Sequence, residues 1–171
     1  MELWDVYDAK RRPLHRTHVR GVPMAKGEYH LVVFVWVFNS RGELLLTKRA
    51  PEKKHYPNLW ECTGGAAQAG ETSLQAIRRE LFEETGIRAE EEEFRLMGSF
   101  CEWSAFCDIY ALRRDAALTD LVMQPGETCD ARWETLERLE EMIAAGQIAQ
   151  PDVRRFRQLE EKFRALLRQW R

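Results

Sequence analysis

The sequence predicts a single domain of the α/β class, built as a sandwich of strands and helices. The chain has 171 residues, which is enough for one sizeable hydrophobic core and too few for two. Segments rich in β-branched and aromatic residues mix with segments whose apolar residues recur at helical spacing, and the expected strands outnumber the expected helices. No repeat, low-complexity tract or linker divides the sequence.

The first quarter of the chain predicts three strands and a long connection. Residues 2–8 alternate apolar and polar side chains, as a short strand does, whereas residues 9–28 carry two prolines, two glycines and many charges and are expected to form a loop. Residues 29–39 are almost wholly apolar, which is typical of a central strand covered on both faces. After a turn, residues 43–49 are expected to pair with that strand as a hairpin.

A helix is expected after a loop that covers residues 50–60. Starting at Leu74, apolar residues recur at i, i+3 and i+7. Thr72 or Ser73 can cap the start of the helix, and Gly86 can end it.

The second half predicts further strands followed by two amphipathic helices. Residues 94–113 form one or two strands, and residues 127–136 form another short one. Residues 137–146 and about 152–170 form the helices. We expect the apolar side of the last helix to pack on its own domain or across a homodimer.

Composition and charge exclude several classes of protein. The formal net charge is -2, so no broad basic surface is available for nucleic acid or for an anionic membrane. The longest apolar run is far too short to span a membrane and Met1 is followed by an acidic, mixed segment, so we expect a cytoplasmic protein. The four cysteines show no CxxC pair, and we expect reduced, mostly buried thiols.

Three carboxylates crowd together in the predicted helix that ends at Gly86. Taking Glu80 as the origin, Glu84 falls about 40° to one side and Glu83 about 60° to the other, at the border of the apolar stripe. Carboxylates this close repel one another, and the single guanidinium of Arg79 cannot neutralise three of them. A hard divalent cation such as Mg²⁺, which prefers oxygen ligands, can do so. The cluster is therefore compatible with a metal site, although an isolated acidic triplet at this spacing is more often a solvated helix face.

The same stretch matches a longer pattern at every specified position. The pattern is Gx5Ex7REUxEExGU, where U is an aliphatic residue, and its matching residues are Gly65, Glu71, Arg79, Glu80, Leu81, Glu83, Glu84, Gly86 and Ile87. This pattern is the Nudix box, so the chain resembles a Nudix hydrolase. The resemblance implies an α/β/α sandwich with a mixed β-sheet. It also implies hydrolysis of a diphosphate linkage in a nucleoside diphosphate derivative or a related organic pyrophosphate.

The resemblance further implies Mg²⁺ or Mn²⁺ as cofactor and a role for each matching residue. The implied metal ligands are Glu80, Glu83, Glu84 and the backbone carbonyl of Gly64. The residues implied to shape the motif are Gly65, Glu71, Arg79 and Gly86, with Glu71 and Arg79 orienting the loop and the helix. The general base in this family is a box glutamate or a glutamate from a later loop, so the candidates are Glu84, Glu80 and Glu127. A plain surface position is the alternative for Glu127.

Residues outside the pattern are candidates for holding a small-molecule diphosphate. Five basic residues lie between positions 48 and 55, just upstream of the box, and among them Arg49 and Lys54 are proposed to bind phosphate. Trp103, in a less regular segment, is a candidate for stacking on a nucleobase, whereas Trp36 and Phe34 in the central strand are expected to pack in the core.

Two other activities are weighed against hydrolysis. Residues 2–8, 28–50 and 57–65 resemble the branch of the family related to isopentenyl-diphosphate isomerase, whose box loop carries a catalytic cysteine and, two residues later, a histidine ligand. Gly64 and Ala66 stand at those places here, and Cys62 is displaced by two residues. A lone His30 does not restore that site. A non-catalytic module that binds a nucleotide is the third possibility, although a retired site would be free to lose its box carboxylates.

Overall fold

The computed structural model describes residues 1–170, which form nine β-strands, three α-helices and two short 3₁₀ helices. The strands are β1 (Leu3–Tyr7), β2 (Pro13–Val19), β3 (His30–Phe38), β4 (Leu44–Arg49), β5 (Trp60–Glu61), β6 (Thr63–Ala66), β7 (Arg95–Glu102), β8 (Ala105–Arg113) and β9 (Thr128–Glu134). The helices are α1 (Ser73–Thr85), α2 (Leu136–Ala144) and α3 (Gln150–Trp170), and the 3₁₀ helices are Glu91–Glu93 and Leu118–Asp120.

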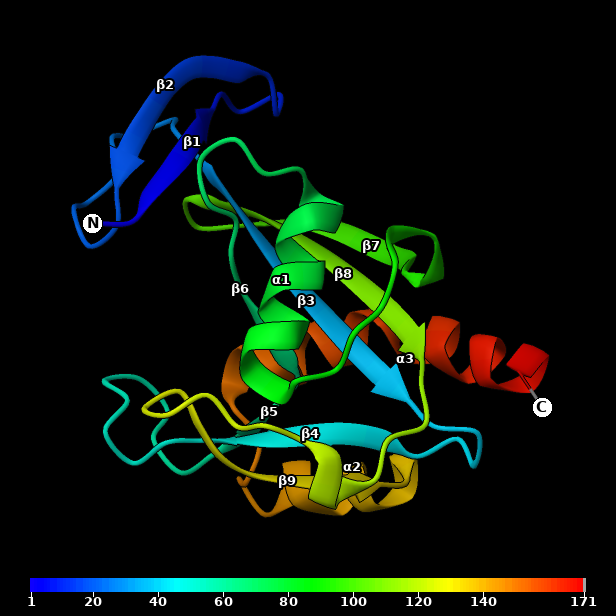
Figure 1. Ribbon diagram of the computed structural model, residues 1–171. Helices are drawn as coiled ribbons and strands as arrows, with labels where there is room; N and C mark the ends of the chain where they lie inside the picture. The colour runs from blue at the N-terminus through cyan, green and yellow to red at the C-terminus, as the bar shows by residue number, and fades with distance from the viewer. Residues whose placement is uncertain (171) are drawn as a thin grey trace.

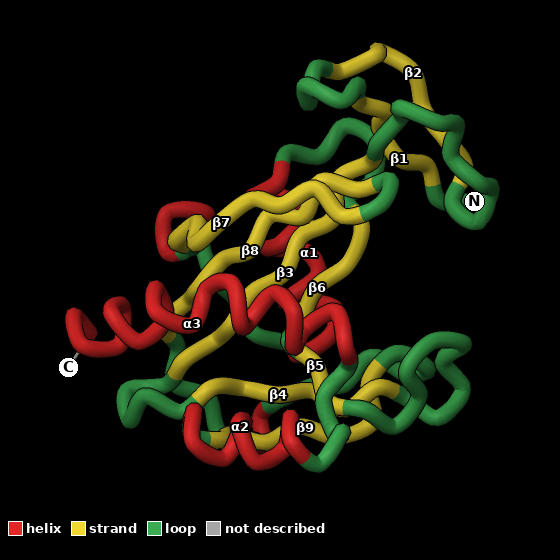
Figure 2. The backbone as a smooth tube through the Cα atoms, turned by 180° about the vertical axis from the view of Figure 1, so that it is seen from behind, coloured by secondary structure: helices red, strands yellow, loops and turns green. Residues whose placement is uncertain are grey.

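Strand β3 is the centre of a mixed sheet. It runs parallel to β8 along its whole length and antiparallel to β6, and β7 extends the sheet on the far side of β8. Helix α1 covers one face and α3 the other, as Figures 1 and 2 show from opposite sides. The expected α/β/α sandwich with a mixed sheet is confirmed.

The side chains of β3 alternate between two hydrophobic clusters. Leu31, Val33, Val35 and Val37 face the cluster under α1, whereas Trp36 and Phe38 face the cluster under α3. Trp36 packs against both Phe156 and Phe163 of α3, with ring centroids 5.6 Å away in each case. The apolar side of α3, which begins two residues earlier than expected, therefore packs on the sheet of its own chain. A homodimer stays a prediction.

Strand β2 corrects the expectation that residues 9–28 form a loop. It pairs antiparallel with β1 in a separate two-stranded sheet, which lies at the N-terminal end of β3 (Figure 1). Most of its residues are exposed, so it has no buried face and no apolar alternation to reveal it in the sequence. Pro13 stands at the first position of the strand, where a missing N–H is tolerated.

The predicted hairpin of β3 and β4 exists only at its base. The two strands pair at Phe38 and Leu44, after which β6 takes the neighbouring place on β3, and β4 pairs with β9 and β5. The expectation of buried thiols holds for only two cysteines. All four are free, but Cys101 and Cys129 are exposed. None of the helices within residues 1–170 is long and apolar enough to cross a membrane.

Candidate active site

The loop and helix that carry the carboxylates are closed at both ends by local interactions. The Thr72 hydroxyl accepts from the backbone N–H of Gln75, and the Gln75 side chain accepts from the Thr72 N–H, which makes a capping box. Gly86 ends the helix in the left-handed conformation, with φ 75°. The predicted bounds of α1 are therefore confirmed, and its carboxylates have a fixed frame.

Arg79 is bonded to most of the acids of this region. Its guanidinium donates to both oxygens of Glu71, at 2.7 and 2.9 Å, and to the carbonyl of Ala66 at 3.1 Å. The same group donates to Glu80 at 2.8 Å and to Glu83 at 3.1 Å. Arg79 thus ties the box loop to two of the three clustered carboxylates.

Glu84, the third carboxylate, is buried and has no cationic partner within residues 1–170. Its residue is 6% exposed, and one oxygen accepts from the Gly64 N–H at 3.3 Å. Burial raises the pKa of Glu84 well above its usual range, and the charges of Glu61 and Glu80 raise it further. Burial also raises the pKa of Glu80, although Arg79 opposes the shift. Such carboxylates are unfavourable as anions unless a positive charge approaches them.

The donor chemistry of the cluster fits a divalent cation. Within residues 1–170, no three His, Cys, Asp or Glu side chains are arranged to hold a metal ion as they stand. Arg79 pairs with Glu80 and Glu83. The groups present are nevertheless carboxylate oxygens, one of them buried without a countercharge, which is what a hard cation prefers. Gly65 allows the loop to come this close, because a Cβ there would meet a Glu80 oxygen at 2.5 Å.

Glu61, which the sequence did not single out, belongs to the same group of acids. It lies in the two-residue strand β5 and pairs with Arg49 at 2.6 Å. Burial and the charge of Asp152 raise the pKa of Glu61 to about 7, although Arg49 opposes the shift. The strand is too short to show a periodic pattern, so only its place just before the box loop could have drawn attention to Glu61.

The structure brings some of the other predicted residues to these acids and leaves others apart. Glu127 comes close enough for its charge to affect the pKa of Glu84, and its side chain pairs with Lys53. Arg49 is held by Glu61 and by the His55 carbonyl, at 2.9 Å. Lys54 is exposed, and Lys53 takes the inward position instead.

A pocket of about 350 Å³ lies on the α3 side of the sheet. It is lined by His30, His55, Tyr56, Trp103, Arg154 and Arg155, among others. Trp103 stands on its rim, 86% exposed, in the turn between β7 and β8.

Arg155 connects this pocket to the box loop. It donates to Glu102 at 2.7 and 3.1 Å, and its guanidinium lies 3.8 Å from the centroid of the Phe34 ring. That ring fills the space where a Cβ of Gly64 would stand. A chain of contacts from Arg155 through Phe34 to Gly64 thus links the pocket to the box loop.

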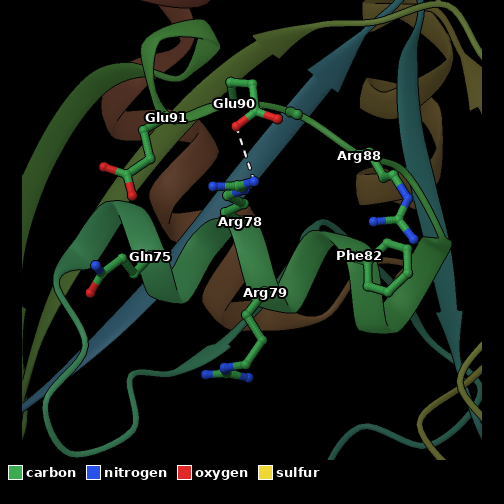
Figure 3. A pocket seen from close by; sticks show the side chains of 8 residues that line it. Gln75, Arg78, Arg79, Phe82, Arg88, Glu90 and Glu91 are labelled. Carbon is green, nitrogen blue, oxygen red and sulfur yellow. Dashed lines mark ion pairs between the residues drawn. The ribbon is translucent and has the colours of Figure 1, made fainter.

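A second pocket, of about 360 Å³, lies on the outer side of α1 and does not include the clustered carboxylates. Figure 3 shows Arg78 paired with Glu90, at 3.0 Å, while Arg79 points to the other side of the helix. Arg88 covers Phe82, 4.2 Å from the ring centroid. Among its lining residues only Arg79 belongs to the box pattern and contacts the clustered carboxylates, so we do not place the active site in this pocket.

Comparison with known proteins gives one family. The NUDIX domain model matches residues 28–156. An uncharacterised Nudix hydrolase of Listeria innocua is 39% identical over 148 residues, which are 86% of this chain and 88% of that protein. An isopentenyl-diphosphate Delta-isomerase of Citrobacter koseri is 30% identical, over 82% and 81% of the two chains.

A crystal structure from Deinococcus radiodurans agrees with this fold. It superposes with a TM-score of 0.71 at 30% identity and covers 86% of this chain and 92% of its own. The family model spans well over half of the chain, and the box residues occupy the loop and helix described above. This chain belongs to the Nudix family.

Proposed function

We propose that this protein is a metal-dependent hydrolase that cleaves the diphosphate linkage of a nucleoside diphosphate derivative or a related organic pyrophosphate. The observation that carries the proposal is that Glu84, buried beside Glu80, has no cationic partner within residues 1–170. A pocket large enough for an organic group is linked to the box loop through Arg155 and Phe34. Nudix proteins typically use divalent metals. A similar fold, a bifunctional NMN adenylyltransferase/ADP ribose pyrophosphatase from Francisella tularensis, was crystallised with AMP and manganese.

Each residue has a distinct part in this reaction. Glu80, Glu83, Glu84 and the Gly64 carbonyl would hold Mg²⁺ or Mn²⁺, which supplies positive charge against the diphosphate oxygens and makes water a better nucleophile. Arg79 positions Glu80 and Glu83 from behind. A glutamate then accepts the proton of the attacking water, with Glu84, Glu80 and Glu127 as candidates.

The substrate would extend from the carboxylates into the pocket on the α3 side. Trp103, exposed on the rim, and Arg155, on the floor, offer a flat apolar surface and hydrogen-bond donors to the organic group. Arg49 and Lys54 stay proposed as phosphate-binding residues. Arg49 already donates hydrogen bonds to Glu61 and to the His55 carbonyl, so it would bind phosphate in addition to these partners.

Isomerisation is a second candidate because an isomerase is 30% identical over most of this chain. The residue types at the site argue against it. Gly64 and Ala66 occupy the places of that enzyme's cysteine and histidine, and Cys62 is buried and donates to Asp152 at 3.0 Å. Burial raises the pKa of the Cys62 thiol well above its usual value, which disfavours any role as a thiolate.

A substrate panel tests the proposal. Nucleoside di- and triphosphates, dinucleotides, nucleotide sugars and isopentenyl diphosphate are incubated with Mg²⁺ or Mn²⁺, and released phosphate, nucleoside monophosphate and dimethylallyl diphosphate are measured. We expect hydrolysis, reduced by about 100-fold or more in Glu84→Gln and unchanged in Glu92→Gln, an exposed glutamate outside the box. Binding without turnover would favour the non-catalytic module, and formation of dimethylallyl diphosphate would favour the isomerase.

A further inference from the structure

The hairpin of β1 and β2 precedes the region that the family model matches, yet it is bonded to the box loop. The family model begins at residue 28. The Ala69 N–H donates to the Leu3 carbonyl at 2.8 Å, and the Gly70 N–H donates to an Asp5 carboxylate oxygen at 2.8 Å. The hairpin therefore holds the loop that leads into α1.

The other end of the hairpin is anchored on the sheet. Arg11, in the turn between β1 and β2, donates from both terminal nitrogens to Asp108 of β8, at 2.7 and 2.5 Å. Ser73 and Ser99 also donate to Asp108, each at 2.6 Å, so this buried carboxylate is fully engaged. Held at both ends, the hairpin forms a fixed wall rather than a free arm.

The open end of the hairpin connects the substrate pocket to an arginine. The indole of Trp4 stacks on His30, which lines the pocket, with centroids 4.0 Å apart and planes 10° apart. The Trp4 Nε1–H donates to one oxygen of Glu2 at 2.8 Å. Arg20, just after β2, donates to the other oxygen at 2.7 Å.

Arg20 stands beside Glu2 at the end of the hairpin that is bonded to the box loop through Leu3 and Asp5. The hydrogen bond to Glu2 raises the pKa of Arg20, and the charges of Glu2, Glu127 and Glu80 raise it further. The pKa of neighbouring His30 is lowered to about 4, first by burial and also by the charges of His18 and Arg20. Arg20 thus lies at the end of the hairpin that contacts both the box loop and, through Trp4 and His30, a wall of the pocket.

Exposure distinguishes Arg20 from the other basic groups beside these acids. The side chains of Arg79, Arg49 and Lys53 are 20%, 17% and 19% exposed, and each is engaged by carboxylates. The Arg20 side chain is 57% exposed and, like Arg49 and Lys53, pairs with one carboxylate, in this case that of Glu2. Among these four groups, Arg20 has the most surface open to an incoming anion.

We propose that Arg20 is a phosphate-binding residue of the active site and that the β1–β2 hairpin is the wall that carries it. The inference rests on the proposed function, because the ligand that Arg20 would bind is the diphosphate of the proposed substrate. A guanidinium can donate two parallel hydrogen bonds to a phosphate, so Arg20 can bind the ligand while it still contacts Glu2.

Calorimetric titration with inorganic pyrophosphate and with α,β-methylene ADP, in the presence of Mg²⁺, tests this proposal. We expect Arg20→Ala to weaken both dissociation constants by about 10-fold or more, because a charge-assisted hydrogen bond is lost. Arg16→Ala is the matched control, since Arg16 is an arginine of the same hairpin, in β2, and is also paired with one glutamate, Glu28; it should change both constants by less than about 2-fold.

Kinetics with any substrate found by the panel provide a second readout. Contact with phosphate in both the ground state and the transition state predicts a raised KM and a kcat within about 3-fold of the wild type. Arg20→Lys keeps the charge and should recover part of the affinity. A fall in kcat with KM unchanged would contradict phosphate binding by Arg20.

Glu2→Gln separates phosphate binding from a purely structural role. This variant keeps an acceptor for Trp4 and removes the charge that competes for Arg20, so we expect affinity to be unchanged or increased. Equal weakening in Glu2→Gln and Arg20→Ala would mean that the pair only holds the hairpin, and would overturn the inference. If the wild type binds these ligands and Arg20→Ala binds them with the same dissociation constants, this inference alone is overturned. Wild-type protein that neither binds nor hydrolyses any of these compounds would overturn the proposed function as well.

Discussion

Replacing either of two adjacent glycines of the box loop by alanine should cause a different loss, of stability at Gly64 and of activity at Gly65. A Cβ at Gly64 would lie 2.3 Å from the Val33 carbonyl oxygen and 2.9 Å from the Phe34 Cα, which are backbone atoms of β3. A Cβ at Gly65 would instead meet the carboxylate of Glu80 at 2.5 Å. Backbone paired in a sheet cannot move aside, whereas the end of a glutamate side chain can.

The two contacts predict different losses. Gly64→Ala should lower the free energy of unfolding by about 3 kcal/mol, at the upper end of the range for overpacked cores, because β6 would have to separate from β3. Gly65→Ala should stay within about 1 kcal/mol of the wild type, since Glu80 can rotate and alanine reduces the entropy of the unfolded chain. Its activity should nevertheless fall on the order of 100-fold, because a displacement of about 1 Å in a positioned group can have that effect.

Urea denaturation followed by tryptophan fluorescence measures the first difference, and turnover of the best panel substrate measures the second. With a slope of about 2 kcal/mol per molar urea, a loss of about 3 kcal/mol lowers the midpoint by about 1.5 M. Equal midpoints for the two variants would refute the steric reasoning. Full activity in stable Gly65→Ala would show that Glu80 does not need its present position.

Three further outcomes are expected. Adding Mn²⁺ to the metal-free protein at about 100 times its dissociation constant should stabilise the protein by about 2.7 kcal/mol, measured as a raised Tm in scanning calorimetry. The Glu84→Gln variant should lose most of this rise in Tm. An equal rise in the wild type and the variant would show that Glu84 is not a metal ligand. The folded state binds more protons than the unfolded state between the ordinary pKa of Glu61, 4.5, and its folded value of about 7, so stability should fall as pH rises through this window. In metal-free Glu61→Gln, the free energy of unfolding should fall less steeply with pH than in the wild type, by about 1.4 kcal/mol per pH unit. Urea denaturation at several pH values measures both slopes, and equal slopes for the two proteins would contradict the prediction. Trp103→Ala should leave stability within about 0.5 kcal/mol, because the side chain is 86% exposed, and should raise KM for a nucleotide by about 3- to 10-fold; an unchanged KM would exclude stacking.

Local patterns in the sequence were sufficient for the helix that carries the carboxylates. Thr72 and Gly86 close it as predicted, since a cap involves only neighbouring residues. The rotation of about 100° per residue placed the acids at the border of the apolar stripe, and the structure buries Glu84, half-buries Glu80 and leaves Glu83 exposed. Strand β3 was equally clear, because a strand covered on both faces is apolar at nearly every position.

Pairing between distant segments could not be predicted in this way. Strand β2 is held by hydrogen bonds to β1 and presents no buried face, so its side chains carry no strand pattern. The separation of β3 from β4 depends on β6 and β9, whose residues lie far along the chain. Glu61 joined the site for the same reason, since nothing within a two-residue strand shows which acids will surround it.

The sequence by itself determined the α/β class, the box helix and the chemical nature of the acids in the candidate metal site, because each depends on residue type and short-range periodicity. Only the tertiary structure decided which groups surround those acids: Arg79 pairs with two of them, the charges of Glu61 and Glu127 act on Glu84 from other segments, and the β1–β2 hairpin is bonded to the box loop. Desolvation and charge proximity arise when segments far apart in the chain pack together, and no local pattern contains them.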